Sequence, residues 1–263
     1  MNRTATAILV AAGLVACQSK SEGGATSEPK AKKVSKTAAG STGTITGKIT
    51  FDGAAPEMPD LAARFTEAGA PKDAVCTTHE KAEHLIVNGG GVKDVVVRLA
   101  VGAAPKGNPP AEPAVIDQHN CRYTPHVLGL VAGQQLAFKN SDATMHNIHM
   151  YNGTESVANI AQQKGAPENL TDVKTPAGDT PFVVRCDVHP WMTAYVLVTD
   201  HPYFAVTGDD GSFKIANVPI GTYTLQAWHP HMGTKTVEVK VEPGAPVEAK
   251  LAAFTPADYK APQ

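Results

Sequence analysis

Polar and apolar residues alternate over many short stretches of this chain, with the two-residue period of a half-buried β-strand. Residues 44–51 read TITGKITF and stop at Asp52-Gly53, a dipeptide typical of a turn. The same pattern predicts strands at 92–99, 182–186, 193–199, 204–207, 212–216, 223–228 and 234–241. Residues 129–140 predict a turn at Ala132-Gly133 followed by an alternating strand, and residues 62–68 predict one short helix. Many short strands separated by glycine and proline turns predict an all-β chain built from sandwiches or barrels.

Composition narrows the possible function classes. The 263 residues include 23 glycines and 20 prolines, and 18% are charged. This length allows one large domain or two small ones. The formal net charge of −2 gives no strong basic field, so a nucleic-acid partner is not expected. Four cysteines are too few for a disulfide-dense miniprotein, so each cysteine needs an explanation of its own.

The first 17 residues have the pattern of an export signal. Arg3 precedes an apolar stretch that is too short to span a bilayer. The letters LVAC at 14–17 resemble the lipobox of bacterial lipoproteins. That resemblance implies a signal peptide over 1–17, a lipid on Cys17 and a periplasm-facing anchor in the bacterial envelope, with Gln18 favouring the outer membrane. An ordinary cleaved signal and a short buried helix are the alternatives.

Residues 18–42 consist mainly of Ser, Gly, Ala, Lys and Pro without apolar periodicity. Such a segment cannot bury enough apolar surface to fold, so it predicts a disordered linker. Five lysines against two glutamates give the linker a net charge of +3. A basic linker of this kind either lies near anionic lipid or is simply solvated.

The most specific chemistry lies in the segment CDVHPWM at 186–192. It holds a thiol at Cys186, an imidazole at His189 and a thioether at Met192, between two predicted strands. A second imidazole, His146, lies 40 positions upstream of Cys186, at the end of another strand. Two imidazoles, one thiolate and a weak axial thioether form the donor set of a blue-copper electron-transfer site. Zinc also binds cysteine and histidine, but it has little use for a thioether.

Residues 117–199 resemble the cupredoxin family, in its amicyanin-like and plastocyanin-like members. That family shows a Cys-x-x-His-Pro-aromatic-Met loop, which CDVHPWM matches. It also shows a strand that ends in Asn and is followed by His-Asn-Val-His. The segment FKNSDATMHNIHM matches this second motif, with Ile148 in place of Val.

The resemblance implies a Greek-key β-sandwich that binds one type 1 copper ion. The implied ligands are His146, Cys186, His189 and Met192. Asn147 would brace the ligand loop by hydrogen bonds, and Pro190 would stiffen it. A redox protein partner would dock near the exposed edge of His189.

The sequence gives less support for the other histidines as metal ligands. His149 has the opposite strand parity to His146 and should face away from the metal. His119 and His126 lie on or near predicted strands. The segment WHPHM at 228–232, with two histidines and a methionine, is a candidate second soft-metal patch, although His-Pro turns are common without metal.

Cys76 and Cys121 remain after the lipid and copper assignments. In an exported protein, two remaining cysteines most simply form a disulfide. The alternatives are two unpaired buried thiols, or a second copper site that combines Cys121 with His119 or His126.

The C-terminal segment at 204–254 resembles the carboxypeptidase regulatory-like (prealbumin-like) β-sandwich. The matching positions are Thr207, Gly211, Phe213, Pro219, Gly221 and Tyr223, and residues 43–49 match the opening of that family. The resemblance implies a discontinuous sandwich over 43–105 and 202–263, with a copper domain at 106–201 inserted between its parts. Alternatively, residues 44–99 belong to the cupredoxin.

These observations predict an exported, lipid-anchored copper protein that shuttles single electrons between periplasmic redox partners. A copper storage, delivery or resistance protein and a non-catalytic surface interaction module are the alternatives. We expect no enzyme activity, because a saturated ligand shell leaves no open position for a substrate.

Overall fold

The computed structural model describes residues 41–61, 74–76, 81–172 and 178–262, all of which belong to one compact unit, Ser35–Gln263. The predicted signal peptide with Cys17, nearly all of the predicted linker and the predicted helix at 62–68 lie outside the described residues. No helix among the residues described is long and apolar enough to cross a membrane.

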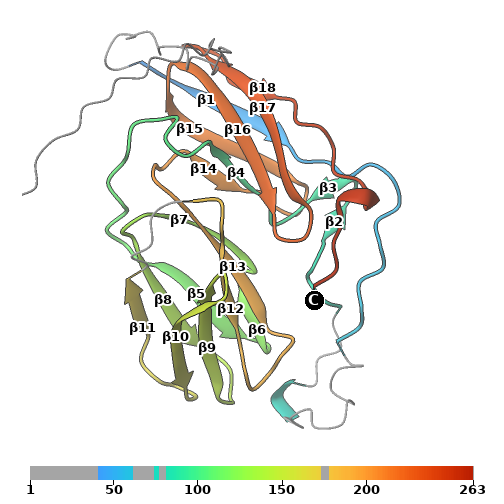
Figure 1. Cartoon of the computed structure of the whole chain (residues 1–263), viewed down its shortest axis with the longest axis vertical. Helices are drawn as coiled ribbons and strands as arrows, with labels where there is room; N and C mark the ends of the chain where they lie inside the picture. Colours follow the sequence, from blue (N-terminus) through green and yellow to red (C-terminus); the bar gives the residue numbers. More distant parts are fainter. Residues whose placement is uncertain (1–40, 62–73, 77–80, 173–177, 263) are drawn as a thin grey trace, which may run out of the picture. The chain divides into compact units, whose positions relative to one another are not determined.

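One group of strands combines the N-terminal and C-terminal parts of the described chain (Figure 1). A three-stranded sheet has the order β15-β1-β18, and a four-stranded sheet has the order β14-β4-β16-β17. Their bounds are β1 (Thr42–Lys48), β4 (Val96–Leu99), β14 (Phe204–Val206), β15 (Ser212–Pro219), β16 (Gly221–His229), β17 (Gly233–Val241) and β18 (Val247–Ala249). Ile45, Val97, Ile215, Leu225 and Phe254 are among the apolar side chains buried in their common core.

The strands between β4 and β14 form two further sheets. A five-stranded sheet has the order β10-β9-β12-β13-β7, and a four-stranded sheet has the order β11-β8-β5-β6. Their bounds are β5 (Ala114–His119), β6 (Arg122–Thr124), β7 (Val127–Val131), β8 (Gln135–Asn140), β9 (His146–Asn152), β10 (Glu155–Gln162), β11 (Asn169–Asp172), β12 (Phe182–Arg185) and β13 (Thr193–Thr199). Ile116, Phe138, Ile148, Val184 and Val196 are fully buried in the core of this group.

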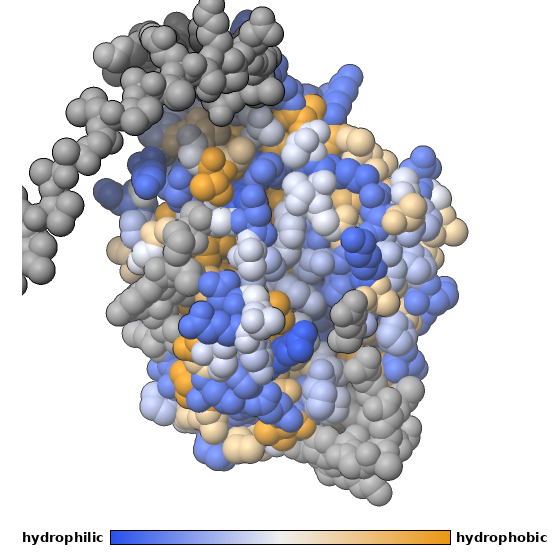
Figure 2. Space-filling view, in the orientation of Figure 1, coloured by the Kyte–Doolittle hydropathy of each residue, from blue (hydrophilic) through white to orange (hydrophobic). Residues whose placement is uncertain are grey.

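Short elements complete the described chain. Strands β2 (Val87–Asn88) and β3 (Gly91–Val92) form a hairpin, and two 3₁₀ turns, η1 (Ala74–Cys76) and η2 (Pro256–Asp258), lie outside the sheets. On the face shown in Figure 2, the described surface is largely polar, with apolar residues in small separate groups.

The predicted all-β class is confirmed, and most predicted strands occur within a few residues of their expected bounds. Strand β13 has the bounds predicted for it, and the expected turn at Ala132-Gly133 separates β7 from β8. Residues 114–119 and 155–162 also form strands, and these two strands are missing from the prediction. His146 was expected at the end of a strand. It is instead the first residue of β9, because β8 already ends at Asn140 and a short loop separates the two strands.

The two groups of strands touch along β4, β7 and β13. Val96, Val127 and Leu197 form a small buried apolar cluster there. Arg98, with only 2% of its surface exposed, donates from Nη1 to the backbone oxygen of Val198 at 3.2 Å. The domain boundaries given above stay a prediction. The structure adds that β1 and β4 pair only with strands from the C-terminal segment among the residues described.

The predicted disulfide between Cys76 and Cys121 is confirmed. The two sulfurs are bonded, and the bridge links residues 45 positions apart. It ties η1 to the turn between β5 and β6. The second-copper alternative for Cys121 is therefore wrong, because a disulfide sulfur is no longer a thiolate donor.

Candidate metal centre

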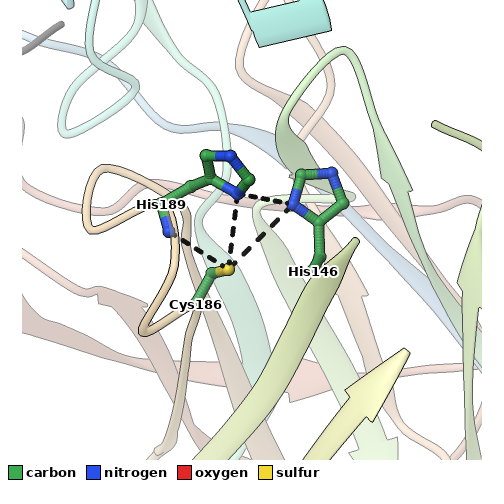
Figure 3. A group of neighbouring side chains, drawn as sticks. All are labelled: His146, Cys186 and His189. Carbon is green, nitrogen blue, oxygen red and sulfur yellow. Dashed lines mark hydrogen bonds between the residues drawn. The ribbon is translucent and has the colours of Figure 1, made fainter. Parts of the chain in front are cut away.

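Three of the predicted ligands converge at one end of the five-stranded sheet. His146 opens β9, Cys186 directly follows β12, and His189 lies in the loop between β12 and β13 (Figure 3). Because β12 pairs with both β9 and β13, the sheet itself brings these residues together from positions 40 apart in the chain. The loop is closed by two backbone hydrogen bonds, from Cys186 to Met192 and from Met192 to His189.

The donor atoms lie close enough to share one metal ion. The Nδ1 atoms of His146 and His189 are 2.9 Å apart, and the Cys186 sulfur lies 4.0 and 3.8 Å from them. All three side chains are buried. Both imidazoles direct the same nitrogen, Nδ1, toward the sulfur, as Figure 3 shows. Two imidazoles and a thiol that converge in this way fit the binding of one transition-metal ion such as copper.

A carboxylate fixes the orientation of His146. Its Nε2 donates to Oδ2 of the buried Asp142 at 2.8 Å. Asp142 also accepts hydrogen bonds from the backbone N–H groups of Asn120 at 2.7 Å and Cys121 at 2.8 Å. With Nε2 held in this way, His146 has Nδ1 left for a metal. This carboxylate–histidine pairing is the usual support of metal-ligating imidazoles.

Charge stabilisation within the group favours an ionised thiol. Burial would raise the pKa of Cys186, but hydrogen bonds from His146 and His189 lower it to about 6. Burial would likewise lower the pKa of His146, but its bonds to Asp142 and Cys186 raise it to about 9. Burial would also raise the pKa of Asp142, yet the bonds from His146 and the two backbone N–H groups lower it overall. The pocket therefore stabilises a thiolate before any metal binds.

Asn147 contacts both sides of the ligand loop. Its backbone N–H points at the Cys186 sulfur at 3.5 Å, and its Oδ1 accepts from the backbone N–H of Asp187 at 2.6 Å. Its Nδ2 donates to Oδ2 of Asp187 at 3.0 Å. The backbone N–H of His189 also points at the sulfur, at 3.4 Å. These contacts are the kind that the sequence resemblance implied for Asn147, and its role at a bound metal stays a prediction.

The fourth predicted ligand, Met192, ends the same loop. It is 1% exposed and packs in the apolar core that also contains Cys186. Pro190, the residue expected to stiffen the loop, is exposed next to His189. Between them, the indole of Trp191 donates to the backbone oxygen of Cys121 at 3.1 Å, so the disulfide turn also supports the ligand loop.

His189 has no exposed edge, contrary to the expectation from the resemblance. Only 1% of its surface is accessible. Trp191 packs against its ring, with centroids 5.1 Å apart. Leu61 and Ala82 lie close by, since they line a small cavity together with Trp191 and Met192. Docking of a partner near His189 stays a prediction.

The remaining histidines do not join this group. His149 lies on β9 with its Nδ1 2.9 Å from Oδ2 of Asp187 and its Nε2 2.9 Å from Oγ of Ser156, so it faces away from the three donors as predicted. His119 is exposed. Among the residues described, the other close donor group is Cys121, Asp142 and His146, and its sulfur belongs to the disulfide.

A second set of buried histidines lies elsewhere, and it consists of His126, His229 and His231. The Nδ1 of His126 donates to the backbone oxygen of Thr193 at 2.9 Å. His231 lies 3.2 Å from the backbone oxygen of Lys260 through Nδ1 and 3.3 Å from the hydroxyl of Tyr195 through Nε2. Within the part of the chain that the structure describes, WHPHM contributes to no group of donors close enough to hold one ion. A metal at that patch stays a prediction.

Sequence reasoning missed Asp142 and the link from Trp191 to Cys121. Asp142 precedes His146 by four positions, yet the two residues do not share a helix or strand. The only signal was an acidic residue close to a suspected ligand, which is common by chance. The contact depends on the loop between β8 and β9, whose course the residue pattern does not reveal.

Comparisons with known proteins give partial matches. The family model of the carboxypeptidase regulatory-like domain matches residues 183–253. This match begins within β12, which belongs to the five-stranded sheet in the structure. No curated protein matches the chain.

Similar solved structures are copper proteins. A point mutant of amicyanin in its oxidized state is 25% identical, with a TM-score of 0.28 over 36% of this chain and 99% of that one. A purple cupredoxin from Nitrosopumilus maritimus is 21% identical, with a TM-score of 0.29 over 33% of this chain and 99% of that one. The Cu-containing nitrite reductase of Thermus scotoductus SA-01 is 19% identical, with a TM-score of 0.29 over 38% of this chain. This chain spans only 25% of that enzyme.

Proposed function

We propose that this chain is an exported electron-transfer protein that shuttles single electrons between periplasmic redox partners through one type 1 copper ion. The observation that carries the proposal is the convergence of two imidazole Nδ1 atoms on the buried Cys186 sulfur. A thioether at Met192, in the same loop and the same core, completes the donor set. A thioether favours copper over zinc at such a site.

Copper held in this shell supplies a one-electron couple, Cu(I)/Cu(II). Cys186 would supply a thiolate, His146 and His189 would supply imidazole nitrogens, and Met192 would supply a thioether. Soft sulfur suits the reduced ion and imidazole suits the oxidised ion, so the same residues serve both states. A donor set that changes little between the two states keeps the reorganisation cost of electron transfer low.

The surrounding protein keeps the donors in place. Asp142 orients His146, and Asn147 joins β9 to the ligand loop through Asp187. All three donor side chains are buried. Such rigid support is expected for electron transfer and is unfavourable for rapid metal release, so it argues against the storage and delivery alternative.

The cellular setting is part of the proposal. Export, the lipid on Cys17 and a periplasm-facing, outer-membrane anchor rest on the N-terminal sequence pattern alone. A protein partner would approach the ligand loop near His189, where Pro190 is exposed. We also propose that the chain has no catalytic activity of its own, because all four donors are protein side chains.

Voltammetry of the copper-loaded chain, combined with a chelator challenge, tests this function. The account expects a reversible one-electron wave and no measurable copper loss to a weak chelator over the same period. His119→Gln, a change at an exposed histidine outside the site, is the matched control and should behave like the unmodified chain. Rapid copper loss without a reversible wave would contradict electron transfer and favour storage or delivery.

A further inference from the structure

A cavity of about 440 Å³ lies beside the metal centre. Its walls include Cys186 itself, together with Asp187, Pro190 and Trp191 of the ligand loop. The remaining lining residues are Leu61, His84, Tyr151, Arg185, Thr193, Tyr195 and Pro262. This volume falls within the range of small-molecule sites, roughly 300–1,000 Å³. The function proposed above makes no use of the cavity.

The floor of the cavity is the outer face of the five-stranded sheet. In the strand register, Tyr151 and Tyr195 lie opposite Val183 on its two sides. Arg185 is two residues further along β12, so it stands on the same face, next to Cys186. Two aromatic rings therefore flank the strand that leads to the cysteine ligand, and a guanidinium stands at its end.

The polar groups of the three aromatic residues already have partners within the protein. The Tyr151 hydroxyl lies 2.8 Å from Nδ1 of His149, and the Tyr195 hydroxyl lies 3.3 Å from Nε2 of His231. The indole N–H of Trp191 donates to the backbone oxygen of Cys121. These bonds hold the rings in fixed positions at the cavity. Rings held in this way favour stacking with a flat apolar group and lose little entropy when they bind one.

Arg185 gives the cavity its charge. It is exposed, and within the described ranges its guanidinium makes no ion pair or hydrogen bond. The nearby carboxylate of Asp187 is engaged with His149, Asn147 and Asn159 on the β9–β10 side. The guanidinium is therefore left to bind an incoming anion, and its planar fork matches a carboxylate.

We propose that this cavity binds a small aromatic carboxylate. Its ring would stack among Tyr151, Trp191 and Tyr195, and its carboxylate would pair with Arg185. A ligand seated there touches the residue that carries the sulfur of the metal centre. The support for this site is the three aromatic rings, the strand register that places Tyr151 and Tyr195 beside β12, and the positive charge of Arg185. It holds whether or not the copper function is correct.

Calorimetric titration of the full chain with benzoate tests this site, before and after copper loading. Benzoate should bind with one site per chain, and Arg185→Gln should weaken binding about 10–100-fold, since it removes a charged hydrogen-bond donor. Lys214→Gln removes one positive charge from an exposed position on β15 and should leave the affinity unchanged. Thermal unfolding of each variant verifies that it is folded.

Two comparisons make the result decisive. Cyclohexanecarboxylate has the same charge without an aromatic face, so it should bind more weakly than benzoate. Tyr195→Leu should reduce the preference for benzoate while it keeps the dependence on Arg185. Absence of benzoate binding, or equal binding to Arg185→Gln and the unmodified chain, would overturn the proposal. Equal binding of the two carboxylates would overturn its aromatic part.

Discussion

Two buried histidine groups in this protein have opposite electrostatics. In the metal centre, the pKa of His146 is raised to about 9, although burial works in the other direction, because Asp142 and Cys186 stabilise the charged ring. In the second group, burial and the neighbouring His231 lower the pKa values of His126 and His229 to about 3. Both groups bury imidazole rings, yet among the described residues only the first has a carboxylate and a thiol as partners.

The hydrogen bonds of His146 and His231 differ in the same way. His146 gives Nε2 to a carboxylate and keeps Nδ1 directed at a sulfur. His231 has both ring nitrogens within reach of protein oxygens, which leaves it without a nitrogen for a metal. A cluster of histidines is therefore not a metal site by itself. In the first group, two ring nitrogens and a sulfur also converge within 4.8 Å of one another, which is the spacing that one ion needs.

The largest expected effect comes from removing the thiolate. Cys186→Ala should abolish any charge-transfer absorption and leave two imidazoles that bind copper far more weakly, because no sulfur donor remains. Copper titrations followed by visible absorption measure the change. His229→Gln, the equivalent disruption of the second group, should leave the copper spectrum unaltered. Equal spectral effects of the two variants would erase the contrast between the groups.

Loss of the disulfide should have the next largest effect. The bridge closes a segment of 45 residues, and replacing both Cys76 and Cys121 by serine should cost about 4 kcal/mol of unfolding free energy. Copper affinity should fall as well, because the backbone of Cys121 supports Asp142 and Trp191. Urea unfolding and copper titration measure the two effects. Unchanged copper affinity in a destabilised variant would show that the turn does not support the centre.

Asp142→Asn tests whether the hydrogen bond to His146 supports the site, and it leaves all four proposed ligands unchanged. The amide keeps the shape of the carboxylate but loses its charge, so copper affinity should fall about 10–100-fold. Asp117→Asn, another carboxylate of the same region whose partners are Ser141 and Lys139, should leave the affinity nearly unchanged. A fall of the same size in both variants would point to a general charge effect.

The second histidine group should make the free energy of unfolding depend on pH. Its pKa values in the folded protein lie below the unfolded value near 6.5, so unfolding takes up protons in this range. Stability should therefore be highest above about pH 6.5 and fall as the pH decreases toward 3, by up to about 1.4 kcal/mol per pH unit for each histidine. His229→Gln should reduce this slope in urea unfolding between about pH 4 and 6. An unchanged slope would contradict the burial argument.

Residue types and spacing were enough to predict most of the strands and the three convergent donors. CDVHPWM carries its chemistry within seven residues, and the alternation in 193–199 fixes the face of β13. The disulfide followed from counting cysteines. The strands and the ligand loop are local features. The disulfide was expected because Cys76 and Cys121 were the two cysteines without another predicted role.

Features that depend on the course of a loop escaped prediction. Asp142 reaches His146 only because the loop between β8 and β9 folds back over the turn at Asn120 and Cys121. His189 packs against Trp191, and Leu61 and Ala82, which lie far away in the sequence, line a small cavity with that indole. The cavity above β12 depends on strand register, which places Tyr151 and Tyr195 on either side of Val183. No residue pattern specifies these contacts.

Visible absorption combined with electron paramagnetic resonance of the copper-loaded chain tests the central claim most directly. The account predicts an intense thiolate-to-Cu(II) absorption band and a type 1 resonance at one copper per chain, both absent from Cys186→Ala. A colourless Cu(II) form without a thiolate charge-transfer band would contradict it.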